Sequence, residues 1–180
     1  MLWIHSSAKW SARSDGASYD RESTNCAGPQ ERRRPGDPAK AFEVFTAGID
    51  RWWPKTHGIG AAPLLASIIE PFVGGRWYTR HGDGADLVIG HVLVWQPAER
   101  FVCTWEIGAD WKTDSRAAFA SEVEVRFLAE DAGRTRVELE HRNFERMGPP
   151  GECMRKDVDG GWPALLERYA QEMSRGESQA

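Results

Sequence analysis

Hydrophobic and polar residues alternate strictly over residues 122–127 and again over residues 136–141. Apolar side chains or histidine occupy every second position, and glutamate or arginine fills the positions between them. A period of two is typical of a strand with one face buried and the other in water. Residues 131–133, Asp-Ala-Gly, have the composition of a tight turn between the two segments. The pattern predicts an antiparallel hairpin with a charged outer face.

Further strands are predicted upstream, each bounded by glycine or proline. They cover residues 64–70, 76–81, 87–95 and 101–107. Gly74 and Gly75 make the first turn, and a Gln-Pro-Ala-Glu segment makes the last. The segment 87–95 is apolar on both faces, so we expect it to be central or doubly covered. Residues 55–63 and 110–118 are expected to be loops.

Two helices enclose this run of strands along the chain. Asp37 and Pro38 are typical of a helix start, and the spacing of Phe42 and Phe45 predicts a helix over residues 38–47. A longer apolar stripe predicts a helix over residues 151–174, where Pro163 should cause a kink or a restart. An antiparallel sheet needs one face covered, and the longer helix is the expected cover.

The first 37 residues differ from the rest of the chain. Residues 6–38 are rich in Ser, Arg, Asp, Gly and Pro and poor in aliphatic side chains. Such a segment buries too little apolar surface to offset its ordering entropy, so we expect residues 1–37 to be disordered or loosely attached. Residues 38–174 are expected to form one domain, followed by a tail over residues 175–180.

Composition excludes several classes of function. The net charge of −4 provides no basic face for nucleic acid. Three cysteines without metal-ligand spacing favour a cytoplasmic location. The sequence has no apolar run long enough for a membrane span and no convincing secretion signal. The nine tryptophans are unusual, and they indicate either a tryptophan-rich core or an aromatic cavity.

Six short motifs occur in a fixed order along the chain. They are PAKAFEVFT at 38–46, WWP at 52–54, IEPFVGGRW at 69–77, GHVLVWQP at 90–97, TW at 104–105 and GWP at 161–163. With these motifs the chain resembles the START-like (SRPBCC) superfamily, in the branch related to the C-terminal domain of the activator of heat shock protein 90 ATPase. The resemblance implies an α+β helix-grip fold, a curved antiparallel sheet wrapped around a long C-terminal helix.

The resemblance fails in one place. Family members begin with a strand directly before the first helix, but here residues 25–36 contain two prolines and no apolar alternation. We therefore expect the first strand to be missing, degraded to an edge, or replaced by a sequence that is not native. We favour the last explanation, through a misassigned start or a reading-frame error.

No catalytic, metal or cofactor constellation is evident, so we expect no metal and no cofactor. Glu70 and Cys103 are interpreted as structural, and His91 as an edge or core histidine or a polar anchor in a cavity. The interior is expected to form either a filled core or a ligand cavity. The cavity candidates are Trp53, Trp77, His91, Trp95, Phe101, Trp105, Val125, Phe127, Leu139, Trp162, Leu166 and Tyr169.

Three hypotheses about function follow. The first is a non-catalytic domain that binds a small hydrophobic or amphipathic molecule, with His91 or Arg76 as a polar contact. The second, implied by the resemblance alone, is a chaperone-binding module that uses the charged face or residues 108–118. The third is a cyclase- or hydrolase-type enzyme, which needs a polar pair at the cavity drawn from Glu70, His91 and His141.

Overall fold

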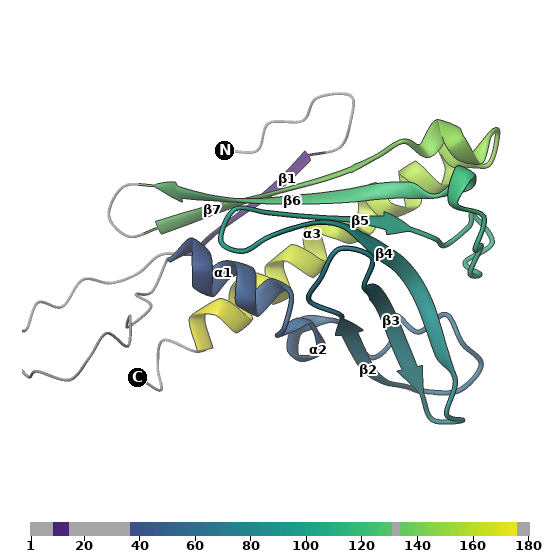
Figure 1. Ribbon diagram of the computed structural model, residues 1–180, viewed down its shortest axis with the longest axis horizontal. Helices are drawn as coiled ribbons and strands as arrows, with labels where there is room; N and C mark the ends of the chain where they lie inside the picture. The colour runs from purple at the N-terminus through teal and green to yellow at the C-terminus, as the bar shows by residue number, and fades with distance from the viewer. Residues whose placement is uncertain (1–8, 15–36, 131–133, 176–180) are drawn as a thin grey trace, which may run out of the picture.

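One curved antiparallel sheet dominates the computed structural model, which describes residues 9–14, 37–130 and 134–175 (Figure 1). Its seven strands lie in the order β1-β7-β6-β5-β4-β3-β2. The bounds are β1 Lys9–Ser14, β2 Leu64–Ile69, β3 Arg76–His81, β4 Asp86–Gln96, β5 Arg100–Trp105, β6 Ser121–Glu130 and β7 Arg134–Arg142. Sequence neighbours from β2 to β7 pair as successive antiparallel strands, as the alternation and the turns predict.

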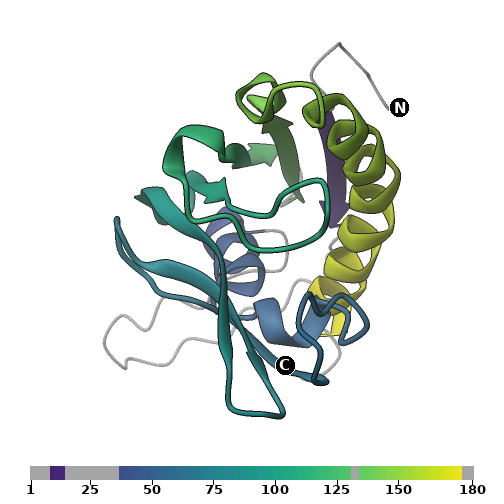
Figure 2. The ribbon, with the colours of Figure 1, turned by 90° about the vertical axis from the view of Figure 1, so that its right-hand side faces the viewer.

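Helices cover the inner face of this sheet. The long helix α3, Gly151–Arg175, runs along one side of the curved strands (Figure 2). Pro163 lies inside α3 without ending it. The shorter helix α1, Pro38–Phe45, is capped by Asp37, whose carboxylate accepts a hydrogen bond from the backbone N–H of Ala39. This arrangement is the helix-grip fold that the sequence predicts.

Three short elements complete the described chain. They are the helix α2, Ile49–Trp52, and the 3-10 helices η1, Ala117–Phe119, and η3, Phe144–Met147. The sequence analysis ended the first helix at residue 47 and did not predict α2, which is only four residues long. The Tyr169 hydroxyl donates to the carbonyl oxygen of Ala41, 2.9 Å away, which joins α3 to α1.

Two irregularities in β4 change which side chains face the helices. The register with β3 shifts beside Ile89, and the register with β5 shifts beside Leu93. An extra residue in one strand reverses the alternation beyond it. Ile89 and Val92 are therefore buried, whereas His91 between them turns toward the other face.

A strand, β1, is present at the edge of the sheet; of the three alternatives expected from the sequence this fits an edge strand, and a non-native N-terminal sequence stays a prediction. Residues Lys9–Ser14 form β1 and pair with β7, from Lys9 opposite Glu140 to Ser14 opposite Thr135. The strand lies at the sheet edge and well before Pro38, where the composition of residues 6–38 hid it. Residues 1–8 and 15–36 lie outside the described residues, so their loose attachment stays a prediction.

Candidate functional site

A cavity of about 530 Å³ lies between the middle of α3 and the loop after α2. Ile89 of β4 and Trp105, the last residue of β5, close it on the side of the sheet. Its size is in the range of small-molecule sites. Its walls are formed largely by aromatic and branched apolar side chains. The lining residues are Trp53, Thr56, His57, Gly58, Ile59, Ile89, Trp105, Ile107, Trp111, Asp157, Val158, Gly161, Trp162 and Leu165.

Three buried indoles form the inner wall. Trp53 and Trp105 both meet Trp162 edge to face, with ring centroids 6.3 and 6.0 Å apart. Behind them Trp77 contacts Trp53 at 5.1 Å and Trp105 at 5.8 Å. Because each ring is held by its neighbours, the wall is largely preformed.

The polar atoms of this wall are not all satisfied. Trp162 Nε1 donates to His141 Nδ1 at 3.2 Å. Among the described residues, the Nε1 atoms of Trp53 and Trp105 are buried and have no hydrogen-bond partner. Neither atom is accessible to water, so these two rings present an apolar surface to the cavity.

The mouth of the cavity carries exposed and titratable side chains. His57 lies there beside Thr56, and partial burial, followed by the positive charge of Arg168, lowers the pKa of His57. Asp157 and Trp111 line the same opening from α3 and from the loop after β5. Trp111 has a left-handed backbone, with φ of 57°, and is 44% exposed.

Most of the other predicted cavity residues fill the core instead. Helix α1 covers that part of the sheet, since Phe42 contacts Trp95 and Phe127, and Phe45 contacts Phe101 and Tyr169. Val125, Leu139 and Leu166 are buried in the same cluster. Only Trp53, Trp105 and Trp162 of the predicted set line this cavity, and Trp77 supports them from behind.

None of the three polar candidates lines the cavity. His91 does not line the cavity; its Nδ1 lies 2.7 Å from Glu106 Oε1, and its side chain is 44% exposed. The Glu70 carboxylate accepts hydrogen bonds from the backbone N–H and the guanidinium of Arg76. These bonds support its structural interpretation. No pair among Glu70, His91 and His141 forms at the cavity wall that the structure describes.

Sequence reasoning missed the residues that the turns and bulges bring to the site. Ile107, Val158 and Leu165 belong to apolar patterns that the sequence shows, but His57, Ile59 and Trp111 lie on loops without periodicity. Gly161 also lines the cavity, and a Cβ added there would meet no atom within 4 Å. In the sequence, Gly161 lies among the apolar residues of this helix, and the missing side chain there could have indicated a cavity.

A second hollow of about 610 Å³ lies beside the first, between the loop after β5 and η3. Charged side chains from residues 106–116 form much of its lining, and two of them, Asp114 and Arg116, pair with each other. The aromatic cavity is the better candidate, because its apolar, largely aromatic walls suit a small molecule.

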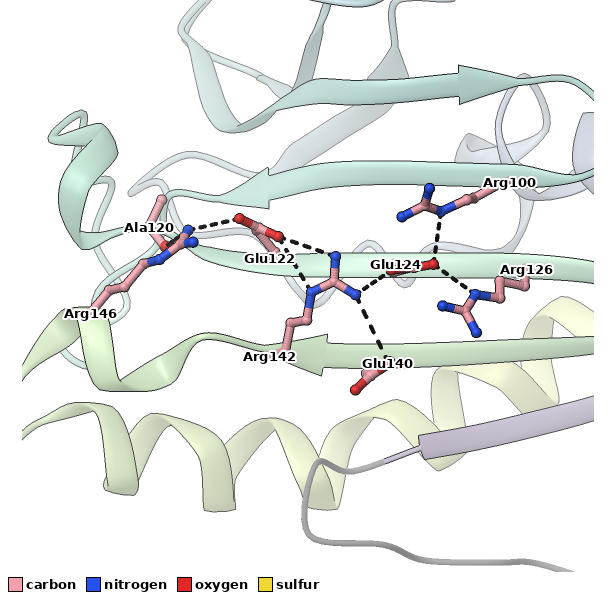
Figure 3. Close-up of polar contacts among 8 residues, drawn as sticks. All are labelled: Arg100, Ala120, Glu122, Glu124, Arg126, Glu140, Arg142 and Arg146. Atoms are coloured by element: carbon pink, nitrogen blue, oxygen red, sulfur yellow. Dashed lines mark hydrogen bonds and ion pairs between the residues drawn. The ribbon is translucent and has the colours of Figure 1, made fainter.

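The outer face of the sheet carries a network of arginines and glutamates (Figure 3). Glu124 on β6 accepts hydrogen bonds from Arg100 at 2.8 Å, from Arg126 at 2.7 Å and from Arg142. Arg142 and Arg146 also pair with Glu122. The predicted charged face is thus confirmed, and its charges largely neutralise one another.

The described residues contain neither a candidate metal site nor a membrane-spanning helix. No group of three or more His, Cys, Asp or Glu side chains in residues 9–14, 37–130 and 134–175 is placed to hold a metal ion. None of the helices in those ranges is both long and apolar enough to cross a membrane.

Solved structures with the same architecture are similar to this chain. One is described as the anthrahydroquino-γ-pyrone synthase Txn09 complexed with SUM; it is 32% identical, with a TM-score of 0.57, over 91% of this chain and 94% of that chain. CalC from Micromonospora echinospora, described as a self-sacrificing resistance protein, is 23% identical, with a TM-score of 0.60, over 94% and 95%. MLL2253 from Mesorhizobium loti is 19% identical, with a TM-score of 0.57, over 93% and 97%.

No curated protein sequence matches this chain. The two structures below 25% identity support the fold alone. A family model, described as activator of Hsp90 ATPase homolog 1-like protein, matches residues 36–174. That match includes α1, α2, the strands β2 to β7 and nearly all of α3. This chain therefore belongs to the AHSA1 family.

Proposed function

We propose that this chain binds a small hydrophobic or amphipathic molecule in the aromatic cavity. The observation that carries the proposal is a wall of mutually packed indole rings that borders a cavity of small-molecule size. Burial of ligand surface against Trp53, Trp105 and Trp162 would supply most of the binding free energy. The cytoplasmic location stays a prediction from the cysteine content.

The relative described as an anthrahydroquino-γ-pyrone synthase supports this proposal. Its description names a fused-ring molecule, which is the kind of ligand that an aromatic wall suits. Because one fold hosts many activities, the resemblance supports the class of ligand and not a particular reaction.

The two other hypotheses have less support from the described residues. An enzyme needs an acid–base pair at the cavity, and its titratable wall residues are His57 and Asp157, with no hydrogen bond described between them. A chaperone-binding module rests on family membership. The charged face offers it no unneutralised patch, since Glu122 and Glu124 are each bound by more than one arginine.

The test compares two adjacent glycines of α3. Gly161 lines the cavity, whereas Gly160 is exposed and does not, and a Cβ at either position meets no atom within 4 Å. We expect Gly161→Leu to fill the cavity and weaken binding of the neutral probe N-phenyl-1-naphthylamine at least tenfold. Gly160→Leu, the matched control, should bind it like the parent chain.

Probe fluorescence gives the affinity, and circular dichroism checks that both variants fold. No binding by the parent chain, or equal loss in both variants, would contradict the proposed function.

A further inference from the structure

Two polar side chains lie along the β2 edge of the sheet. This strand pairs with β3 on one side, and no further strand of the described chain follows on the other. Helix α2 packs against β2 (Figure 1). It supplies Asp50, and the loop after it supplies Lys55. Both side chains bind backbone groups of the edge strand.

The bonds that they make are those of a neighbouring strand. Asp50 Oδ1 accepts from the backbone N–H of Ser67 at 2.8 Å, and Lys55 Nζ donates to the carbonyl oxygen of Leu65 at 2.7 Å. An edge strand otherwise presents such N–H and C=O groups unpaired. Lys55 Nζ also donates to Asp50 Oδ1, so the two side chains hold each other in place. We call Asp50 and Lys55 the β2 cap.

The β2 cap occupies the space that another strand would need. Paired strands lie about 4.8 Å apart, whereas the capping atoms lie within 2.8 Å of Ser67 N and Leu65 O. A further strand could pair there only after displacing both side chains. The register of β2 also shifts between Leu64 and Ala66. Bulges and lysines are both features by which natural edge strands avoid pairing.

The core holds the β2 cap in position. The Trp52 ring of α2 is 1% exposed, and its Nε1 donates to the Val44 carbonyl oxygen at 3.1 Å. Pro54, next to Lys55, is also buried. Asp50 and Lys55 themselves are each 47% exposed. Because exposed ion pairs contribute little to stability, stability alone does not account for this arrangement.

We propose that the β2 cap prevents this edge from pairing with β2 of a second copy of the chain. A second copy fits the edge, since two antiparallel β2 strands can be related by a two-fold axis. Such pairing can bring together the two Leu65 side chains, which are 56% exposed in the single chain. The inference is independent of ligand binding in the aromatic cavity.

The test removes the β2 cap from the full chain without changing its net charge. Asp50→Ala combined with Lys55→Ala frees the backbone groups of the edge. The matched control is Arg80→Ala combined with Asp86→Ala, which removes an exposed ion pair from β3 and β4, strands that are paired on both sides. In sedimentation velocity, the cap variant should dimerise roughly tenfold or more tightly than the parent chain and the control.

Amide hydrogen exchange at rising protein concentration locates the contact. In the cap variant, exchange over residues 64–69 should slow as dimers form, because the edge groups then pair between chains. Dimerisation without slower exchange in this segment would overturn the inference, since another surface would be responsible. Equal association of the cap variant, the control and the parent chain would overturn it as well.

Lys55→Met provides a second variant at an exposed position. It keeps a side chain of similar length but frees the Leu65 carbonyl oxygen, and it should dimerise several-fold more tightly than the parent chain. Circular dichroism checks the fold of the double variant. If that variant does not fold, Lys55→Met decides alone, and an unchanged association would refute the role of the cap. Binding of N-phenyl-1-naphthylamine by the parent chain tests the proposed function separately.

Discussion

Trp162 in α3 donates its indole N–H to Nδ1 of His141 in β7, 3.2 Å away. Because Nδ1 accepts this bond, the imidazole proton lies on Nε2, which is 2.8 Å from Ser121 Oγ and donates to it. The ring is 1% exposed, and burial lowers the pKa of His141 to about 3. A neutral histidine thus fixes the orientation of one wall of the cavity.

We expect the free energy of unfolding to fall as the pH falls from about 6.5. The unfolded chain then binds a proton at His141 that the folded chain does not, since the folded pKa is about 3. The slope for one such group is about 1.4 kcal/mol per pH unit. Urea unfolding at pH 5, 6, 7 and 8 measures it.

His141→Gln should flatten this slope. His57→Gln is the comparison, since the pKa of His57 is also lowered but its side chain is exposed, so it should change the slope less. If His141→Gln kept the slope of the parent chain, the buried neutral histidine would not be its source.

We expect the Glu124 carboxylate to contribute more to the free energy of unfolding than an exposed charged residue does. It is 1% exposed, and although burial opposes its ionisation, hydrogen bonds from Arg100, Arg142 and Arg126 lower the pKa of Glu124 to about 2. Glu124→Gln leaves three arginines without this charge, and we expect a loss of about 2 to 3 kcal/mol at pH 7 by urea unfolding.

The matched control is Glu152→Gln, which removes an exposed carboxylate paired within α3 and should change stability little. In the parent chain the Glu124 contribution is present above about pH 4.5 and is lost as the pH falls toward 2. Equal stability of the two variants at pH 7 would argue against the network.

Gly90 and Gly160 should respond to alanine in opposite directions. A Cβ at Gly90 would lie 1.8 Å from the carbonyl oxygen of Thr104 on β5, so Gly90→Ala must push two paired strands apart. We expect a loss of about 3 kcal/mol. Gly160→Ala enters open space on a helix and should gain about 0.5 to 1 kcal/mol. Thermal and urea unfolding measure both changes, and a tolerated Gly90→Ala would refute the close approach of β4 and β5.

Replacement of Trp111 should weaken ligand binding without lowering the stability of the fold. Its positive φ costs about 1 kcal/mol or more for a bulky residue, and its half-exposed ring lines the cavity mouth. Asparagine tolerates this backbone, so Trp111→Asn should unfold at the same or a higher urea concentration and bind N-phenyl-1-naphthylamine several-fold more weakly. Unchanged affinity would show that Trp111 does not contact the bound probe.

The sequence pattern anticipated the strands β2 to β7 and the helix α3, because burial of one face imposes a period that the chain displays. It located the cavity poorly. Alternation tells which side chains turn inward, but not which part of the sheet α1 fills with Phe42 and Phe45. The bulges beside Ile89 and Leu93 reversed the expected orientation of His91. Because residues 87–95 are apolar on both faces, the sequence pattern does not show where such bulges occur.

The six-residue pairing of β1 with β7 has a consequence for any shortened form of the chain. A chain that starts at Asp37 would lack β1 and expose the hydrogen-bonding edge of β7. An unpaired strand edge is a template for the same edge of another molecule. We therefore expect shortened preparations to associate through β7 more readily than the full chain does.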